Sequence, residues 1–361
     1  MAVDDVPGIP DGPRLARWIS ENGIASGESL AIKLIAGGRS NLTYGLDLGS
    51  SRLVLRRPPL GHVLPTAHDM AREFRVLTAL DGTDIPVPTP VAICDDLDVI
   101  GAPFYLMEYV DGLVLRTRQD AEFLTPGQAR QLSERLVEML AAIHQVDIAK
   151  AGLTGFGRPE GYLARQLARW QRQWELSKTR EVPGYDRLVE RLTAGLPADG
   201  DHALVHGDFR LDNTLVTLDQ RGTPDAQAAQ LRVAAVVDWE MSTLGDPLAD
   251  LGLTLIYWAD PADPQWLDIS IGATVTAMPG FLTRTELAAR YAELTGRDLS
   301  SIGYYMAFGC FKLAVVLEGI HARFLQHQTV GEGFEREGPA VPTLIERAHQ
   351  MLDGVRSGDI G

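Results

Sequence analysis

Cysteine is almost absent from this chain: only Cys94 and Cys310 occur among 361 residues. Because the two lie far apart in the sequence, we expect two free thiols rather than a disulfide framework. Unpaired thiols are typical of reducing compartments, and we therefore expect the protein to act in the cytoplasm.

Positive charge is also scarce, since 33 Lys and Arg residues stand against 48 Asp and Glu residues and the formal net charge is −15. A nucleic-acid partner is therefore not expected, because nucleic acids bind basic surfaces. Residues 1–7 lack the basic and apolar parts of a secretory signal, and no apolar run is expected to span a membrane, so we expect no membrane partner. A chain of this length with 45% hydrophobic residues can bury a sizeable core, which we expect to be divided between two lobes.

What the chain does contain is an ordered set of polar residues between positions 206 and 238. A His-Gly-Asp tripeptide ends at Asp208, and Asn213 follows five residues later. A second carboxylate, Asp238, ends a later β-branched run. In phosphoryl transfer from a nucleotide, one carboxylate orients or deprotonates the attacking hydroxyl, while an amide and a second carboxylate hold magnesium. We therefore predict a kinase in which Asp208 is catalytic, Asn213 and Asp238 bind Mg²⁺, and His206 supports the loop.

Two strand-like runs, residues 214–218 and 231–237, surround this set. The segment between them is polar and rich in turn residues, which predicts a long hairpin loop. The hairpin would return Asn213 and Asp238 to the same end of the two strands. Oxygen ligands meeting there would suit a shared magnesium ion.

The first hundred residues have the pattern of a nucleotide-binding lobe. We expect a helix over residues 12–22, a strand over 30–35, and a second strand through Leu46 and Leu48. The glycine-containing turn between the strands can lay backbone N–H groups over phosphates, although a plain hairpin turn is an equally good interpretation. The residues expected to contact the phosphates are Gly37, Gly38, Arg39, Ser40 and Asn41.

A third predicted strand, residues 52–57, ends in two arginines. Protein kinases have a lysine at this place, paired with a glutamate on the next helix. Here Arg56 takes the place of the lysine, with Arg57 as the alternative, and Glu73 is the expected partner on a helix over residues 68–80. An arginine can hold phosphate oxygens with a forked contact and keeps its charge.

A buried strand over residues 103–108 would lead to the hinge of such a lobe. Backbone groups near Glu108 and Val110 would then bind an adenine. The rest of the chain is strongly helical. The expected helices cover about residues 126–147, 160–178, 184–194, 246–259, 283–295, 300–327 and 340–354.

Two differences from protein kinases indicate a resemblance to another family. Gly207 stands where those enzymes have the arginine of His-Arg-Asp, and Trp239–Glu240 follows the metal aspartate. Both resemble the aminoglycoside phosphotransferase family. More narrowly, four segments are similar to the branch of that family fused to, or encoded beside, acyl-CoA dehydrogenases. These segments are residues 37–41, 53–59, 67–73 and 103–108, and the resemblance extends from about residue 30 to residue 325.

The resemblance implies a protein-kinase-like two-lobe α+β fold. Residues 1–108 would form a small antiparallel-sheet lobe that binds the nucleotide, and residues 109–361 a larger, mainly helical lobe for catalysis and the acceptor. It also implies that Asp250 ties the catalytic loop in place through backbone hydrogen bonds, while Asp246 before Pro247 is expected to be a structural helix cap.

For function, the resemblance implies ATP as donor, Mg²⁺ as cofactor and a small-molecule acceptor, namely a hydroxylated fatty acid carried as an acyl-CoA. A functional link to an acyl-CoA dehydrogenase is implied as well. Two alternatives remain open. One is a kinase for another small hydroxyl compound, such as an aminoglycoside, an amino alcohol or a sugar; the other is a non-catalytic partner that binds a nucleotide or an acyl-CoA.

One feature of the residues themselves bears on the acceptor. Arg165, Arg169 and Arg172 are spaced to share one helix face, and Trp170 lies among them. A basic and aromatic helix fits an anionic ligand with a flat ring, such as CoA, better than a polycationic aminoglycoside. The alternative is a solvated arginine face with Trp170 and Trp174 in the core.

Overall fold

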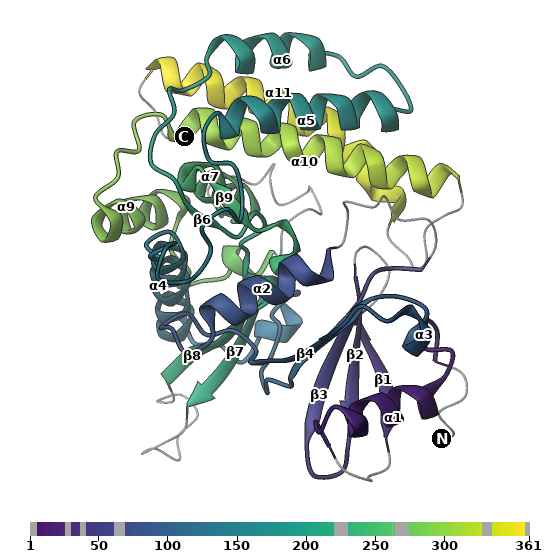
Figure 1. The fold of residues 1–361 in the computed structure, drawn as a ribbon. Coiled ribbons are helices and arrows are strands. Elements are labelled where there is room, and N and C mark those ends of the chain that lie inside the picture. The colour runs from purple at the N-terminus through teal and green to yellow at the C-terminus, as the bar shows by residue number, and fades with distance from the viewer. Residues whose placement is uncertain are drawn as a thin grey trace. The chain divides into compact units, whose positions relative to one another are not determined.

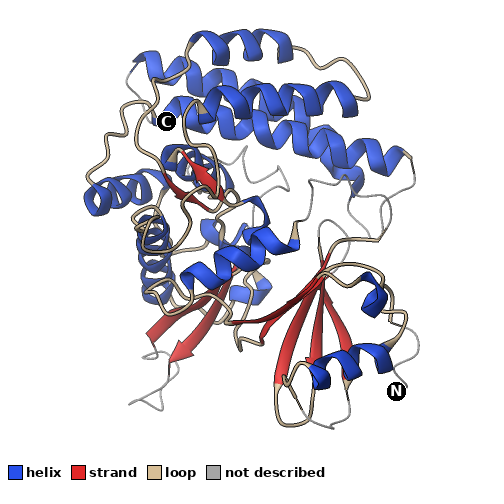
Figure 2. Ribbon diagram, viewed as in Figure 1, coloured by secondary structure: helices blue, strands red, loops and turns tan. Residues whose placement is uncertain are grey.

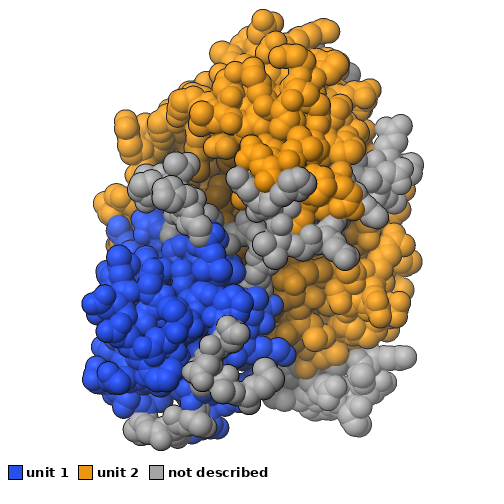
Figure 3. Space-filling model, turned by 90° about the vertical axis from the view of Figure 1, so that its right-hand side faces the viewer, with its two compact units in different colours: residues 1–111 blue, residues 112–361 orange. Residues whose placement is uncertain are grey.

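The structure is a computed structural model, and it describes residues 6–25, 30–36, 41–60, 69–219, 230–261, 263, 274–326 and 334–357. The chain divides into two compact units, Met1–Asp111 and Gly112–Gly361, coloured separately in Figure 3. The assignment of nucleotide binding to residues 1–108 and of acceptor binding to residues 109–361 stays a prediction.

The first unit is built on a five-stranded antiparallel sheet with strand order β1-β2-β3-β5-β4 (Figures 1 and 2). Its strands are β1 (Ala31–Ala36), β2 (Leu42–Asp47), β3 (Arg52–Arg57), β4 (Pro90–Cys94) and β5 (Phe104–Glu108). The predicted strands are therefore present. Strand β4 was not predicted, because its mostly half-buried residues follow a proline-rich stretch and show no clear alternation.

The core of this unit forms because alternate residues of the strands point to one face. Tyr44 and Leu55 join Phe104 in a cluster that also contains Leu15 and Ile19 of helix α1 (Gly12–Glu21). The Asp11 carboxylate caps this helix by accepting from the N–H of Arg14. The short helix α3 (Leu97–Ile100) contributes to the same cluster.

Helix α2 (Met70–Leu80) contacts β4 and β5. Phe74 of α2 contacts the ring of Tyr105. Tyr105 lies between Phe104 and Leu106 on β5, so its side chain points to the opposite face of the sheet. The alternation therefore places α1 and α2 against opposite faces of the sheet. Asp69 caps α2, as its carboxylate accepts from the N–H of Arg72.

The second unit is mainly helical. Its α-helices are α4 (Pro126–Ile143), α5 (Tyr162–Ser177), α6 (Tyr185–Ala194), α7 (Pro247–Tyr257), α9 (Arg284–Thr295), α10 (Ile302–Leu325) and α11 (Glu337–Ser357). All seven predicted helices are present. Helix α4 ends four residues earlier than expected because the chain turns at His144 and Gln145, and the Asp147 carboxylate then accepts backbone N–H groups of a new turn. Short 3₁₀ turns are η1 (Gln119–Ala121), η2 (Leu211–Asn213), η3 (Trp239–Met241), η4 (Thr274–Ala277) and η5 (Phe334–Arg336).

Helix α10 is the core element of this unit, and it packs against α5, α7 and α11 (Figure 1). Contrary to the sequence expectation, it is long and apolar enough to cross a membrane, as the one such helix in the described part of the chain. However, 78% of its apolar window is buried inside the folded unit. Its apolar composition is therefore explained by packing.

Two antiparallel strand pairs complete the second unit. Strand β6 (Ala203–Val205) pairs with β9 (Thr243–Gly245), and β7 (Thr214–Asp219) pairs with β8 (Gln230–Val236). The β7–β8 pair confirms that the two predicted strands pair, while residues 220–229 of the predicted loop lie outside the described residues. In its register Thr214 lies opposite Val236, so the residues that precede β7 and follow β8 meet at one end.

Candidate active site

The segment predicted to be catalytic, residues 206–213, is called the catalytic loop; it begins where β6 ends and runs through Asp208 into η2. Its fold is fixed by the spacing of Asp208 and Asn213. The side-chain amide of Asn213 donates to the backbone carbonyl of Asp208 at 2.8 Å and to a carboxylate oxygen of Asp208 at 3.0 Å. The five-residue spacing thus lets one amide close the loop and orient the aspartate. Because the nitrogen of Asn213 is used in this way, its side-chain oxygen is the atom left for a metal.

Only glycine fits at position 207. Its φ is +83°, and a Cβ there would lie 2.6 Å from the backbone oxygen of Met241. A side chain would be strained by the backbone angle and would also collide with the neighbouring segment. The glycine of His-Gly-Asp is therefore required by close packing between the catalytic loop and η3.

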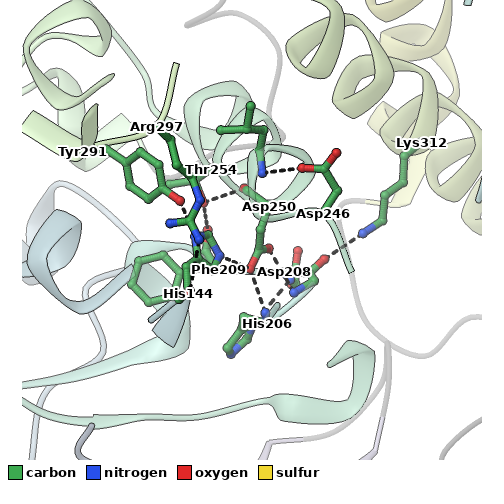
Figure 4. A network of polar contacts seen from close by, with 12 residues as sticks. His144, His206, Asp208, Phe209, Asp246, Asp250, Thr254, Tyr291, Arg297 and Lys312 are labelled. Carbon is green, nitrogen blue, oxygen red and sulfur yellow. Dashed lines mark hydrogen bonds and ion pairs between the residues drawn. The ribbon is translucent and has the colours of Figure 1, made fainter. Parts of the chain in front are cut away.

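Asp250, on the first turn of α7, is buried and accepts hydrogen bonds from the catalytic loop (Figure 4). Its carboxylate accepts from the N–H of His206 at 2.7 Å and from the N–H of Gly207 at 2.9 Å. Asp246 caps the same helix by accepting from the N–H of Leu248, which is the structural role expected for it. Asp250 therefore stabilises the catalytic loop, and Asp246 caps the helix.

Sequence reasoning missed a buried pair behind Asp250. His144, at the end of α4, has its Nε2 3.2 Å from Asp250, and its Nδ1 lies 2.6 Å from the hydroxyl of Tyr291. Burial lowers the pKa of His144, so the imidazole is neutral. Nε2 then donates to Asp250, and Nδ1 accepts from Tyr291. Nothing in the local sequence marks His144, because it stands 106 residues before its partner.

The neighbours of Asp250 also set its charge. Burial raises the pKa of this carboxyl, but the hydrogen bonds from the His144 side chain and from the backbone N–H of His206 outweigh burial and lower it. Asp250 is therefore ionised. An ionised carboxylate is the stronger acceptor for the two backbone N–H groups of the loop.

His206 connects the catalytic loop to the strand that precedes Asp238. It is fully buried, its Nε2 donates to the carbonyl of Val237 at 3.0 Å, and its Nδ1 accepts from the N–H of Asp208 at 3.3 Å. Its ring also lies 4.6 Å from that of Trp239. A single side chain thus fixes the relative positions of the catalytic aspartate and the second carboxylate.

The two expected magnesium ligands lie at adjacent strand ends. The N–H of Val237 donates to the carbonyl of Asn213 at 3.0 Å, so Asp238 follows directly beside Asn213. Asp238 has a left-handed backbone with φ +69°, the one such non-glycine residue in the described ranges. Strained backbone of this kind concentrates at functional sites. One amide oxygen and one carboxylate fit Mg²⁺, which binds few protein ligands and takes the rest from phosphates and water. No cluster of three or more His, Cys, Asp or Glu residues suited to a metal occurs in the described ranges.

A tyrosine and an arginine lie beside Asp208, the predicted catalytic residue. Burial and the negative charge of Asp208 both raise the pKa of Tyr257, so its phenol stays protonated. Arg210 lies over the Tyr257 ring, 4.7 Å from its centre, and its guanidinium donates to both carboxylate oxygens of Asp212. Asp208 therefore has a neutral donor and a paired cation as neighbours.

In the first unit, Arg56 forms a buried ion pair with Glu73. The two side chains approach to 3.2 Å, and they are 9% and 1% exposed. Strand alternation explains why Arg56 is the partner: it faces the side of the sheet that carries α2. Arg57 faces the opposite side, where its guanidinium donates to the carbonyls of Gly8 and Ile100.

Most of the other residues predicted to bind the nucleotide lie outside the described part of this unit. Gly37, Gly38, Arg39 and Ser40 lie outside the described residues, while Asn41 is buried at the start of β2. The N–H of Glu108 donates to the carbonyl of Thr89 at 2.9 Å, so an adenine at this edge would need other backbone groups. Val110 is half-buried at the end of the unit.

The three arginines expected to bind the acceptor do not act as one group. The guanidinium of Arg165 donates to the backbone carbonyls of Arg158 and Glu160. Arg169 lies over the ring of Trp170 at 5.2 Å, and Arg172 is exposed in a groove between α5 and α6.

The tryptophans lie in the core, as the alternative interpretation held. Trp170 is 7% exposed, and Trp174, which is 2% exposed, stacks on Tyr185 at 4.1 Å. Trp170 lines the same small cavity as Gly207 and contacts Lys312 of α10, while Arg169 lies over the Trp170 ring.

Comparison with known proteins identifies relatives of the chain. The family model described as "Phosphotransferase enzyme family" matches residues 31–281. "Acyl-CoA dehydrogenase family member 11" of Rattus norvegicus is 35% identical over 326 residues, which cover 89% of this chain and 40% of the relative. "Acyl-CoA dehydrogenase family member 10" of Mus musculus is 34% identical over 312 residues, or 86% of this chain and 28% of the relative. The chain thus spans less than half the length of these curated relatives.

Solved structures agree on the fold. A crystal structure from Ralstonia eutropha, provisionally assigned as an aminoglycoside phosphotransferase, is 30% identical with a TM-score of 0.76 and covers 95% of this chain and 98% of its own. Aminoglycoside phosphotransferase APH(4)-Ia, in complex with AMP-PNP and hygromycin B, is 14% identical with a TM-score of 0.57 over 96% of this chain and 99% of its own. The predicted kinase-like two-lobe α+β fold is confirmed.

Proposed function

The chain belongs to the phosphotransferase enzyme family, and we propose that it transfers the γ-phosphate of ATP to the hydroxyl of a hydroxylated fatty acyl-CoA. It is a small-molecule kinase whose acceptor group is an alcohol. The single observation that supports the proposed chemistry is the geometry around Asp208. This carboxylate is held by Asn213 on one side, and its loop is held by Asp250 on the other.

In the proposed mechanism, Asp208 accepts a hydrogen bond from the acceptor hydroxyl and takes its proton as the oxygen attacks the γ-phosphorus of ATP. The bond between that phosphorus and the β–γ bridging oxygen breaks, and ADP is the leaving group. Asn213 fixes the rotamer of that carboxylate, because its amide spans the backbone and the side chain of Asp208. Asn213 and Asp238 would hold Mg²⁺, which when bound neutralises charge on the triphosphate. In the first unit, the Arg56–Glu73 pair keeps a cation at a fixed place on the sheet, which suits a phosphate contact.

The acyl-CoA assignment rests on two observations. Relatives that are 32–35% identical over most of this chain are named as members of the acyl-CoA dehydrogenase family. Arg169 of α5 also lies over Trp170, which lines the same small cavity as Gly207 of the catalytic loop, and it supplies a cation there for an anionic ligand. A functional link to an acyl-CoA dehydrogenase and a cytoplasmic setting are part of the same proposal. The two cysteines fit that setting, since Cys94 and Cys310 are buried free thiols.

A second acceptor class is favoured by the structural comparison. The APH(4)-Ia structure contains hygromycin B, so an aminoglycoside or a related hydroxyl compound is the alternative acceptor. The net charge of −15 suits a polycation in bulk solution. The cation at Arg169 favours the anionic acceptor near the loop.

The test is Mg²⁺-dependent consumption of ATP with 4-hydroxyacyl-CoA thioesters, beside free hydroxy acids, aminoglycosides, choline and sugars. Each positive is checked by mass spectrometry for one added phosphate. We expect phosphorylated acyl-CoA from the wild type and none from Asp208→Asn, with Asp186→Asn as an exposed control in the same unit. Phosphate on another acceptor would keep the mechanism and reject the acyl-CoA. Nucleotide binding without transfer to any acceptor would favour the non-catalytic alternative.

A further inference from the structure

Lys312 is the one lysine of helix α10, a mostly apolar core helix whose other charged residues, Glu318 and Arg323, lie nearer its C-terminal end. Its ammonium donates to the carbonyl of Gly207 at 2.7 Å, and Figure 4 shows the side chain reaching from α10 to the catalytic loop. The same ammonium lies over Trp170, 5.6 Å from the ring centre. Packing does not require a charge at this place, since a methionine of similar length would fill it.

The carbonyl that Lys312 holds belongs to the peptide bond joining Gly207 to Asp208. Because a peptide unit is planar, fixing this oxygen also fixes the direction in which the backbone of Asp208 leaves the glycine. The preceding peptide unit is fixed from the other side, where the N–H of Gly207 donates to Asp250. Glycine with a φ of +83° supplies little restraint of its own, so the two charged side chains provide it.

The electrostatics agree with this geometry. Burial lowers the pKa of Lys312 below its usual value with a contribution from nearby Arg169, and the carboxylates of Asp208 and Asp250 offset part of this lowering. A half-buried cation therefore lies close to the catalytic carboxylate and to its supporting aspartate. Charge-assisted hydrogen bonds are stronger than neutral ones, which makes an ammonium a better clamp for the carbonyl than a neutral donor.

We propose that Lys312 is a positioning residue for phosphoryl transfer. It clamps the Gly207–Asp208 peptide so that the Asp208 carboxylate meets the acceptor hydroxyl in a reactive geometry. The proposal rests on the proposed function, since it assigns to Lys312 an effect exerted through Asp208. It predicts that the lysine contributes to turnover and leaves nucleotide binding to other residues.

The test compares Lys312→Met, which removes the donor and the charge, with Lys312→Arg, which keeps both. Lys150→Met is the control, because Lys150 is an exposed lysine of the same unit. Two quantities are measured on the full chain: kcat and KM for ATP and for the acceptor, and hydrogen exchange of the segment 204–213. A displacement of about 1 Å at a reacting group costs roughly 100-fold in rate.

We expect Lys312→Met to lower kcat by about 10- to 100-fold with the KM for ATP unchanged, and to speed exchange in the segment 204–213. Lys312→Arg should restore part of kcat and of the protection, and Lys150→Met should match the wild type. A wild-type kcat in Lys312→Met, or a loss of activity with wild-type exchange in the segment, would overturn the proposal.

The acceptor assay on the wild type tests the proposed function separately from the role of Lys312. If the wild type phosphorylates no acceptor of the panel, the exchange measurement still decides the clamp, and unchanged exchange in Lys312→Met overturns it. If Lys312→Met does not fold, as judged by thermal unfolding, Lys312→Gln replaces it, because the amide keeps a neutral donor. That variant is expected to show intermediate kcat and intermediate protection, and wild-type values for both would overturn the proposal.

Discussion

The Nε2 atom of His144 lies 3.2 Å from the Oδ2 atom of Asp250, and both side chains are buried. A neutral histidine at the end of α4 thereby supports the carboxylate that holds the catalytic loop. Tyr291 of α9 supports the histidine in turn. Buried side chains from α7, α9 and the end of α4 are thus joined behind the loop.

This relationship predicts a pH dependence of stability. Burial lowers the pKa of His144 in the folded chain, while the unfolded value is about 6.5. Below that pH the unfolded chain binds a proton that the folded chain does not bind. The free energy of unfolding should therefore fall as pH drops from about 7 to 5, by up to about 1.4 kcal/mol per pH unit for this group.

The variant His144→Gln isolates the effect, because its amide can still donate to Asp250 but does not titrate. Denaturant unfolding of both proteins at pH 7 and pH 5 is the measurement. We expect a smaller difference between the two pH values in the variant. If the free energy of unfolding changes equally between pH 7 and pH 5 in the two proteins, His144 does not cause the pH dependence.

Asp250→Asn should weaken the catalytic loop. The amide nitrogen of the new side chain cannot accept from the N–H of His206 or Gly207, so at least one charge-assisted hydrogen bond is lost. We expect the free energy of unfolding to fall by about 2 kcal/mol and kcat to fall at least tenfold. Urea unfolding and steady-state kinetics measure the two effects. A variant with wild-type kcat would contradict the supporting role of Asp250.

Gly207→Ala should destabilise the protein through backbone strain and collision with Met241. Gly155→Ala is the matched control, because Gly155 has a φ of +76° with no atom near its added Cβ. Strain alone costs about 1–3 kcal/mol. We expect the loss of unfolding free energy to be larger for Gly207→Ala than for the control. Equal losses would mean that the contact with Met241 relaxes without cost.

The ion pair of the first unit can be tested against an exposed pair. Arg56→Met leaves the carboxylate of Glu73 buried without its cation, which should lower the free energy of unfolding by about 3–5 kcal/mol. Arg52→Met removes an exposed pair with Asp111 and should cost at most about 1 kcal/mol. Similar losses in the two variants would contradict the importance of burial at Arg56.

Much of this arrangement could be predicted from the sequence. The order and spacing of Asp208, Asn213 and Asp238 predict the catalytic loop. The two strand-like runs predict the strand pair that brings Asn213 and Asp238 together. The choice between Arg56 and Arg57 was open at the sequence level, because Pro58 obscures the alternation. The structure pairs Arg56 with Glu73, since the side chains of the two arginines point to opposite faces of β3.

Other parts of the site depend on tertiary packing that leaves no local pattern. His144 follows α4 and contacts Asp250, whereas Lys312 of α10 contacts the carbonyl of Gly207, and both are distant in sequence from their partners. The helix period predicted that Arg165, Arg169 and Arg172 share a face, but it could not predict that Arg165 would bond to nearby carbonyls.

The most direct test of the account is the mass of a 4-hydroxyacyl-CoA after incubation with the wild-type chain, ATP and Mg²⁺. We predict an acyl-CoA that carries one added phosphate on its hydroxyl, formed by the wild type and by Asp186→Asn but not by Asp208→Asn. An unmodified acyl-CoA, in a preparation that phosphorylates another alcohol, would contradict the proposed acceptor. Phosphorylation that persists in Asp208→Asn would contradict the catalytic role on which the mechanism rests.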